Sequence, residues 1–288
     1  MATDDMEWQQ KLDQYLARKL IDPTGPNRKR WGERSQEYLQ THTNWIIEVL
    51  RDEFGALTDL RVLDLGCGNG LDAINLARSG AFVTGVEVVP DLIEIARLRA
   101  RNEQIDVKFS DLNQRDGWDY PQYYDAVIVI DVLEHIEKPI QVIETCYRVL
   151  RPGGIVIFTT PNRWAVQNIL ADPHWRLFGV TLLPRWLSQF YIVSIRHVLR
   201  EYDMTEFVGL PALRRLLDAQ GLARVEDSVT ETQAKWVTPM RIGKSWKRRV
   251  ANIFSTLAKT KLFNFLMTWI YCYLFVGTWR VVARKPVA

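Results

Sequence analysis

A glycine-rich stretch, residues 61–71 (RVLDLGCGNGL), is the part of the chain best suited to bind a ligand. Its alternating apolar residues predict a strand, and residues 71–78 have helical periodicity. Between the two lie glycines at alternate positions, Gly66, Gly68 and Gly70. Glycine adopts left-handed dihedrals and has no Cβ, so a ligand can approach the backbone amides of such a turn. The stretch predicts a nucleotide-binding loop, with a plain turn as the simpler alternative.

Acidic residues at the ends of three expected strands indicate which nucleotide the loop binds. Asp64 stands just before the glycines, where a carboxylate repels a pyrophosphate and attracts an ammonium group. Glu87 follows the middle glycine by 19 residues, where a carboxylate accepts the hydroxyls of an adenosine ribose. Asp111 and Leu112 suit an adenine amino group and face, although an acid after a strand is also a common helix cap. The GxGxG spacing differs from the GxGxxG and GxxxxGK(S/T) loops that bind dinucleotides and phosphates. The predicted ligand has an adenine, a free ribose and an amino-acid tail.

The run DLGCGNG, residues 64–70, resembles the glycine motif of the class I S-adenosylmethionine-dependent methyltransferases residue by residue. The resemblance implies a Rossmann-like α/β fold: a mostly parallel seven-stranded sheet with helices on both faces, plus helical insertions. It also implies S-adenosyl-L-methionine as the cofactor, and a Rossmann oxidoreductase is the main competing interpretation. The cofactor-binding residues expected on these grounds are Asp64, Gly66, Cys67, Gly68, Gly70, Glu87, Val88, Asp111, Leu112 and Asp131.

The segment Asp131 to His135 (DVLEH) follows the fourth expected strand. Ligands bind at the carboxyl ends of the strands in open α/β sheets. Methyl transfer from a sulfonium requires alignment of the acceptor and, for a hydroxyl acceptor, removal of its proton. A histidine can take such a proton near neutral pH. We therefore expect His135 to be the catalytic base or a substrate contact, with Glu134 as its only close companion.

The DVLEH run also resembles the quinone-biosynthesis O-methyltransferases, in which a similar acid and histidine pair follows the fourth strand. One alternative is a structural histidine at the start of a helix, hydrogen-bonded to the backbone. Another is a divalent ion held by Glu134 and His135, but two ligands make a poor site. No metal is therefore expected.

Composition places the chain among proteins with a large buried core, because 47% of its 288 residues are hydrophobic. The three cysteines are scattered and lack metal spacing, so they indicate neither a disulfide framework nor a zinc site. The acidic N-terminus has no apolar stretch of the kind found in secretory signals. These features predict a cytoplasmic protein.

Four regions are expected along the chain. They are an N-terminal helical cap at 1–58, an S-adenosylmethionine-binding core at 59–161, an aromatic substrate-recognition insertion at 162–209, and completion of the sheet at 210–288, with a basic and apolar helical insertion at 236–276.

Within the N-terminal cap, Trp31, Tyr38 or Thr41 is expected to touch the cofactor or the substrate, as such helices do in the resembled family. A helical hairpin packed on the sheet is the alternative. Further along, residues 138–154 predict a helix closed by a proline and two glycines. Residues 222–232 predict the sixth strand and 278–286 the seventh, and the resemblance implies that these two pair antiparallel.

Residues 162–209 are too long for an ordinary connection and are rich in aromatic residues. The insertion is expected to cover the methyl end of the cofactor and to favour a lipophilic or aromatic acceptor. His174, His197 and Tyr202 are further catalytic candidates, and a small helical cap with its own core is the alternative. The expected substrate contacts are Trp164, Trp175, His197 and Tyr202.

The C-terminal region is a separate electrostatic object. Residues 232–288 contain 11 Lys and Arg but no Asp or Glu, although the whole chain has 37 basic and 34 acidic residues. The basic stretch 240–261 precedes an apolar run at 262–277. This order predicts that 236–276 lies on an anionic membrane surface. A buried or dimer-forming helix is one alternative, and a true span is another, although 16 residues are short for it.

Together these features predict a methyltransferase that acts on a small, lipophilic or aromatic acceptor near the cytoplasmic membrane face, with O-methylation favoured. The sequence leaves N- and C-methylation and the oligomeric state open. An RNA or DNA methyltransferase is an alternative that would use the basic region, but no NPPY-like tetrad follows the fourth strand. Nucleic acid is therefore not the favoured partner. A catalytically silent cofactor-binding scaffold protein is the third hypothesis.

Overall fold

The structure is a computed structural model that describes residues 7–22, 42–114, 117–202, 204–237 and 261–287, without the side chains of 233–237 and 261–264. The expectations for Trp31, Tyr38 and Thr41 lie outside the described residues, as does most of the basic stretch 240–261.

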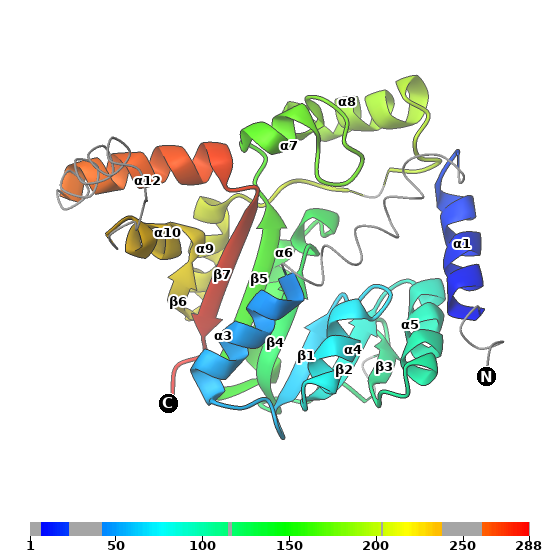
Figure 1. Ribbon diagram of the computed structural model, residues 1–288, viewed down its shortest axis with the longest axis vertical. Helices are drawn as coiled ribbons and strands as arrows, with labels where there is room; N and C mark the ends of the chain where they lie inside the picture. Colours follow the sequence, from blue (N-terminus) through cyan, green and yellow to red (C-terminus); the bar gives the residue numbers. More distant parts are fainter. Residues whose placement is uncertain (1–6, 23–41, 115–116, 203, 238–260, 288) are drawn as a thin grey trace, which may run out of the picture.

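A single seven-stranded sheet in the order β3-β2-β1-β4-β5-β7-β6 forms the centre of the molecule (Figure 1). Strands β3, β2, β1, β4 and β5 run parallel, and β7 is antiparallel to both of its neighbours. The predicted fold class, including the antiparallel pairing of the last two strands, is thereby confirmed. The strands are β1 (Arg61–Leu65), β2 (Phe82–Glu87), β3 (Lys108–Asp111), β4 (Tyr124–Ile130), β5 (Leu150–Pro161), β6 (Ala223–Asp227) and β7 (Thr278–Arg284).

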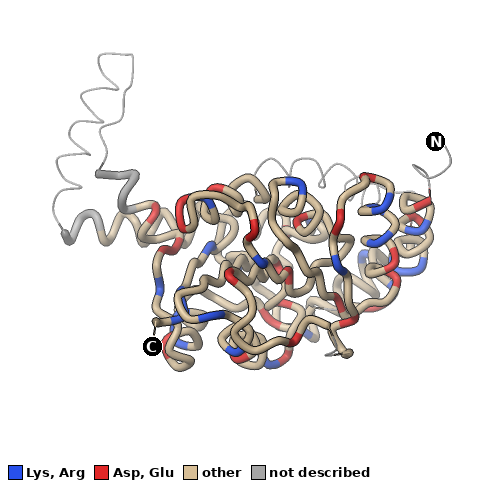
Figure 2. Tube along the Cα trace, turned by 90° about the horizontal axis from the view of Figure 1, so that it is seen from below, with Lys and Arg blue, Asp and Glu red and all other residues tan. Residues whose placement is uncertain are grey.

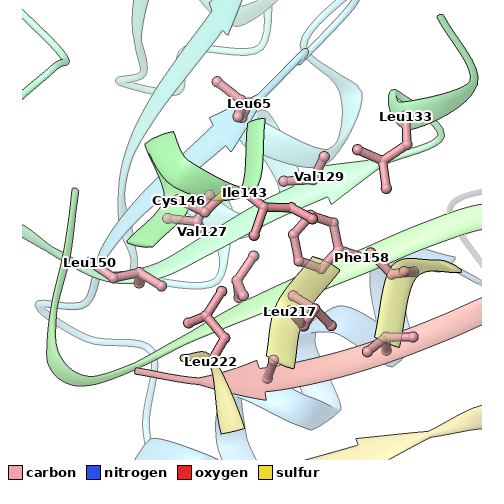
Figure 3. Packing of buried hydrophobic residues seen from close by; sticks show 14 of the residues in the cluster. Leu65, Val127, Val129, Leu133, Ile143, Cys146, Leu150, Phe158, Leu217 and Leu222 are labelled. Carbon is pink, nitrogen blue, oxygen red and sulfur yellow. The ribbon is translucent and has the colours of Figure 1, made fainter. Parts of the chain in front are cut away.

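Helices cover both faces of the sheet because the apolar residues of its central strands point alternately to either side. One face carries α3 (Asn44–Phe54), α4 (Leu71–Arg78) and α5 (Pro90–Asn102). The other carries α6 (Pro139–Val149) and α9 (Leu210–Gln220). Figure 3 shows this second core, in which Ile143 of α6 and Leu217 of α9 pack around Phe158 of β5.

A third apolar cluster lies outside the sheet and joins segments far apart in sequence. Leu16 of α1 (Glu7–Lys19) packs there with Ile95 of α5 and with Ile192 and Leu199 of the insertion. An isolated antiparallel bridge links Leu20 to Leu199. The short helices of the insertion are α7 (Val166–Leu170), η4 (Val180–Leu182), α8 (Arg185–Gln189) and η5 (Phe190–Ile195).

The C-terminal part adds α10 (Ser228–Val237) and α12 (Lys261–Phe275) before β7. Much of the side-chain surface of α12 is apolar and exposed, including Phe265, Trp269 and Phe275. Among the described residues, no helix is long and apolar enough to cross a membrane. Figure 2 shows Lys and Arg interspersed with Asp and Glu over the described chain.

Two expected boundaries were wrong. The helix at 138–154 ends at Val149, and the Pro-Gly-Gly segment after it belongs to the start of β5. The sixth strand ends at Asp227 instead of running to residue 232, because the Asp227 carboxylate accepts the N–H groups of Val229 and Thr230 and begins α10.

Candidate active site

The glycine loop folds back against β2 directly after β1. The N–H of Gly66 donates to the carbonyl of Val86 at 2.8 Å. Gly66 has a φ of +85°, and a Cβ there would lie 2.5 Å from Cγ2 of Val132, so the turn requires glycine. A Cβ on Gly68 would meet nothing within 4 Å. The loop therefore leaves backbone open to a ligand at Gly68.

Buried carboxylates surround this loop. Asp64 is 3% exposed, and its Oδ2 has no hydrogen-bond partner among the described residues. Burial, followed by the charges of Asp72 and Glu87, raises the pKa of the Asp64 carboxyl well above its usual value. Burial also raises the pKa of Asp72 to about 6, although a hydrogen bond from the Thr43 hydroxyl opposes the shift. An Oε atom of Glu87 accepts the N–H of Gly68 at 3.0 Å.

These observations fit the cofactor that the glycine motif implies. The orphaned Oδ2 of Asp64 is suited to an ammonium group, because a cation would offset the crowding of negative charge that raises the pKa of this carboxyl. The open backbone at Gly68 leaves room for the ligand next to the Glu87 carboxylate. The residues present therefore suit S-adenosylmethionine.

The other expected cofactor residues lie along the same edge of the sheet. Asp111 is paired with Glu87 in the β2–β3 register, and the N–H of Leu112 donates to the Glu87 carbonyl at 2.9 Å. Val88 is 48% exposed. Cys67 is buried, which raises the pKa of its thiol well above the usual value.

Asp131 lies at the end of β4 with a positive φ of 52°. The Thr159 hydroxyl donates to its carboxylate at 2.9 Å, and the charge of Asp131 also acts on Asp72. Sequence reasoning missed Thr43, Asp72 and Thr159. Asp72 carried a usable signal, since it is the second residue of the helix that follows the glycines.

The DVLEH segment forms a short 3₁₀ helix, η3 (Leu133–His135). His135 is exposed, whereas Glu134 is fully buried. The His135 ring lies edge-on to the His174 ring of the insertion, with centroids 5.8 Å apart. The Nε2 of His174 lies 3.7 Å from an Oε of Glu134. The expectation that Glu134 is the only close companion of His135 was therefore wrong, because the fold brings His174 to both residues.

The four expected substrate contacts do not meet at one site. Trp175 and Tyr202 are buried in the third apolar cluster. Trp164 is 52% exposed beneath the guanidinium of Arg163, and His197 is exposed with a φ of 49°. The packing of Trp175 and Tyr202 is what the alternative of a helical cap with its own core predicts.

Two clefts lie near the carboxyl-end edge of the sheet. The first, about 460 Å³, is lined by His42, Gln167 of α7, Tyr271 of α12 and Arg280 of β7. His42 directly precedes Thr43, whose hydroxyl donates a hydrogen bond to Asp72. The second, about 400 Å³, runs from Ile136 to the residues that precede α9. None of the four expected substrate contacts lines either cleft.

Among the described residues, no group of three or more His, Cys, Asp or Glu side chains is arranged to hold a metal ion. The cluster of Glu134, His135 and His174 thus lacks metal-binding geometry.

Comparisons with known proteins identify the family of the chain. A methyltransferase-domain family model matches residues 10–227. The ubiquinone biosynthesis O-methyltransferase of Pseudomonas savastanoi pv. phaseolicola is 33% identical over 175 residues, which cover 56% of this chain and 70% of that protein.

Two solved structures share the fold. An S-adenosylmethionine-dependent methyltransferase from Mesorhizobium loti has a TM-score of 0.50 at 17% identity, covering 86% of this chain and 100% of that one. Phosphoethanolamine N-methyltransferase 2 of Haemonchus contortus, in complex with S-adenosyl-L-methionine, has a TM-score of 0.51 at 19% identity, covering 84% and 52%. Because the methyltransferase-domain model matches most of the chain, this chain belongs to the S-adenosylmethionine-dependent methyltransferases.

Proposed function

We propose that the protein transfers a methyl group from S-adenosylmethionine to a hydroxyl of a small lipophilic or aromatic acceptor. The observation that carries this proposal is the exposed imidazole of His135 in the DVLEH segment after β4. Val132 of the same segment packs against Gly66 of the glycine loop. A relative that shares 33% identity is named as an O-methyltransferase, which favours oxygen as the accepting atom.

The cofactor supplies the chemistry when bound, since its sulfonium is an activated leaving group. With the cofactor bound, the acceptor oxygen would form a bond to its methyl carbon as the carbon–sulfur bond breaks, and the sulfur would keep the electron pair. In this chain, His135 takes the hydroxyl proton, and Asp64, Glu87 and Asp111 hold the cofactor. The insertion at 162–209 supplies acceptor contacts.

We also propose that the protein lies on the cytoplasmic face of an anionic membrane. Exposed apolar side chains support this: Trp269 of α12 is 50% exposed, and Phe178 and Trp186 of the insertion are 66% and 70% exposed. Figure 1 shows α7, α8 and α12 on the same side of the sheet, beyond the carboxyl end of β5. The basic stretch 240–261 leads into α12 in sequence. A Lys or Arg side chain near an anionic bilayer contributes about 1 kcal/mol to the free energy of membrane binding.

Activity measurements test the chemistry. The purified protein is incubated with methyl-labelled S-adenosylmethionine and a set of phenols that differ only in the length of an apolar tail. We expect labelled ethers, a preference for the longer tails, and a loss of about 100-fold or more in kcat for His135→Ala. Equal turnover by His135→Ala would rule out the base role, and a preference for tail-free phenols would rule out the lipophilic acceptor.

Sedimentation with vesicles tests the membrane contact. Trp269→Ser should lose binding to vesicles that contain phosphatidylserine. The matched control is Phe82→Ser, because Phe82 is also exposed, at 65%, but begins β2 at the opposite edge of the sheet. Equal retention of both variants by the vesicles, or equal loss of both, would contradict the assignment of α12 to the membrane surface.

A further inference from the structure

A tight turn in the insertion, residues 172–177, is built around one buried carboxylate. Asp172 is 1% exposed. One of its oxygens accepts the N–H groups of His174 and Trp175 at 3.0 and 2.8 Å, and the other accepts that of Leu177 at 2.6 Å. The main chain closes the same turn, since the Asp172 N–H donates to the Leu177 carbonyl at 3.1 Å. The direction in which residue 174 leaves the backbone is therefore fixed.

The side chains on either side of this turn point to different surroundings. Trp175 and Leu177 enter the third apolar cluster, which holds the insertion against α1 and α5. His174 instead reaches the DVLEH segment, where its Nε2 lies 3.7 Å from the Glu134 carboxylate. Its ring meets the His135 ring edge-on, with an angle of 80° between the planes.

A second contact from the insertion holds the same segment from its backbone side. The N–H of Thr205 donates to the Glu134 carbonyl at 2.7 Å, and its hydroxyl lies within 3.0 Å of the carbonyls of Glu134 and Ile136. The insertion thus contacts the main chain of the DVLEH segment through Thr205 and its side chains through His174. A ring packed edge-on restricts the rotation of its neighbour, which matters most where that neighbour is exposed, as His135 is.

We infer that His174 is a positioning residue, which orients the His135 imidazole toward the methyl-transfer site and is itself held by Glu134 and by the Asp172 turn. This inference rests on the proposed role of His135 as the base. It gives the insertion a part in the reaction besides acceptor binding. A base that is aligned before the acceptor arrives loses less entropy in the transition state.

The first test reads the orientation of His135 without using activity. The chain has four histidines, so their ring nitrogens can be assigned by NMR on histidine-labelled protein. We expect His174→Ala to shift the His135 ring nitrogens and change the ratio of its two tautomers. Asp172→Asn should do the same to a smaller extent. The control is Arg196→Gln, an exposed residue of the same insertion, which should leave these resonances in place. Unchanged His135 resonances in folded His174→Ala would overturn the inference.

The second test asks whether His174 acts through His135. His174→Ala should lower kcat about 100-fold, with little change in the KM for S-adenosylmethionine. In a His135→Ala background the same substitution should cost nothing further, because there is no base left to orient. His174→Gln, which keeps a polar group facing Glu134, should recover part of the loss.

The outcomes separate this inference from the proposed function. A loss from His174→Ala that persists in the His135→Ala background would show a structural role and overturn the inference, while leaving the base role intact. If His135→Ala keeps full activity, both fail in the kinetic test. The NMR result still reports whether His174 orients the ring.

Discussion

The side-chain amide of Asn162 donates to the main-chain carbonyl of Val276 at 2.8 Å. The same nitrogen lies within 3.1 Å of the carbonyls of Cys272 and Tyr273, in the last turn of α12. The Cys272 carbonyl also accepts the N–H of Val276 at 3.3 Å. The last carbonyls of a helix have no N–H groups of further turns to accept, so Asn162, which is fully buried just after β5, caps α12 at the carboxyl-end edge of the sheet.

Replacement of this cap should destabilise the fold. Asn162→Ala removes the side-chain donor from the carbonyls of Tyr273 and Val276 and should lower the free energy of unfolding by about 1 to 3 kcal/mol. Urea denaturation measures the loss, with Asn102→Ala at the end of α5 as the comparison. Equal stability of Asn162→Ala and the wild type would show that water replaces the cap.

The glycine loop should separate stability from ligand binding. Gly66→Ala brings a methyl group against Val132 and should cost about 1 to 3 kcal/mol of stability. Adding Val132→Ala should recover part of the loss, and an absence of any recovery would attribute it to the backbone alone. Gly68 has a φ of +52°, so Gly68→Ala carries a backbone cost of about 1 kcal/mol. Its Cβ meets no protein atom, so its larger effect should be weaker binding of S-adenosylmethionine, measured by calorimetry.

Asp72 should make stability fall as the pH rises. Burial raises the pKa of its carboxyl from the ordinary value of 3.8 to about 6, so between these values the folded protein binds more protons than the unfolded chain. A pKa difference of this size lowers the free energy of unfolding by roughly 3 kcal/mol as the pH rises through this range. Asp72→Asn should remove this contribution. The check is urea denaturation of both proteins, without cofactor, at pH 4.5 and pH 7, and identical pH dependences would contradict it.

The ion pair between Arg214 and Asp227 should contribute more to stability than the contact between Arg224 and Asp227. Two nitrogens of Arg214 lie 2.9 and 2.6 Å from one oxygen of Asp227, whose side chain is 1% exposed. Arg214→Ala leaves that charge buried and should cost about 3 kcal/mol. Arg224→Ala removes longer contacts, at 3.7 Å to Asp227 and 3.6 Å to Asp218, from a more exposed position and should cost less than about 1 kcal/mol. Thermal unfolding of both variants tests the difference, and equal losses would contradict the ranking.

The fold and the cofactor side of the site were predictable because their signals are local. The strand, glycine turn and helix around Gly66 are contiguous in sequence, and Glu87 and Asp111 end neighbouring strands. The sequence also contains a signal for the start of α10. Asp227 and Thr230 have the spacing of a capping box, and the Thr230 hydroxyl accepts the Asp227 N–H at 2.9 Å. The alternation of the preceding residues favoured a longer strand, so this start was not predicted.

The acceptor side was less predictable because it depends on contacts between distant segments. His174 lies 39 residues after His135 in sequence, and only the packing of the insertion on α1 and α5 brings the two rings together. The same packing explains why Trp175 and Tyr202 are core residues: aromatic content does not distinguish a pocket wall from the interior of a cap.

The position of β7 has a consequence for synthesis on the ribosome. β7 lies between β5 and β6, yet it is the last of the seven strands along the chain. Until residues 278–284 emerge, β5 keeps an open edge of unpaired backbone groups, and β6 has no neighbour to pair with. From the completion of β5 at Pro161 until β7 is synthesised, the nascent chain therefore carries an aggregation-prone edge, and the sheet is completed only when β7 is inserted.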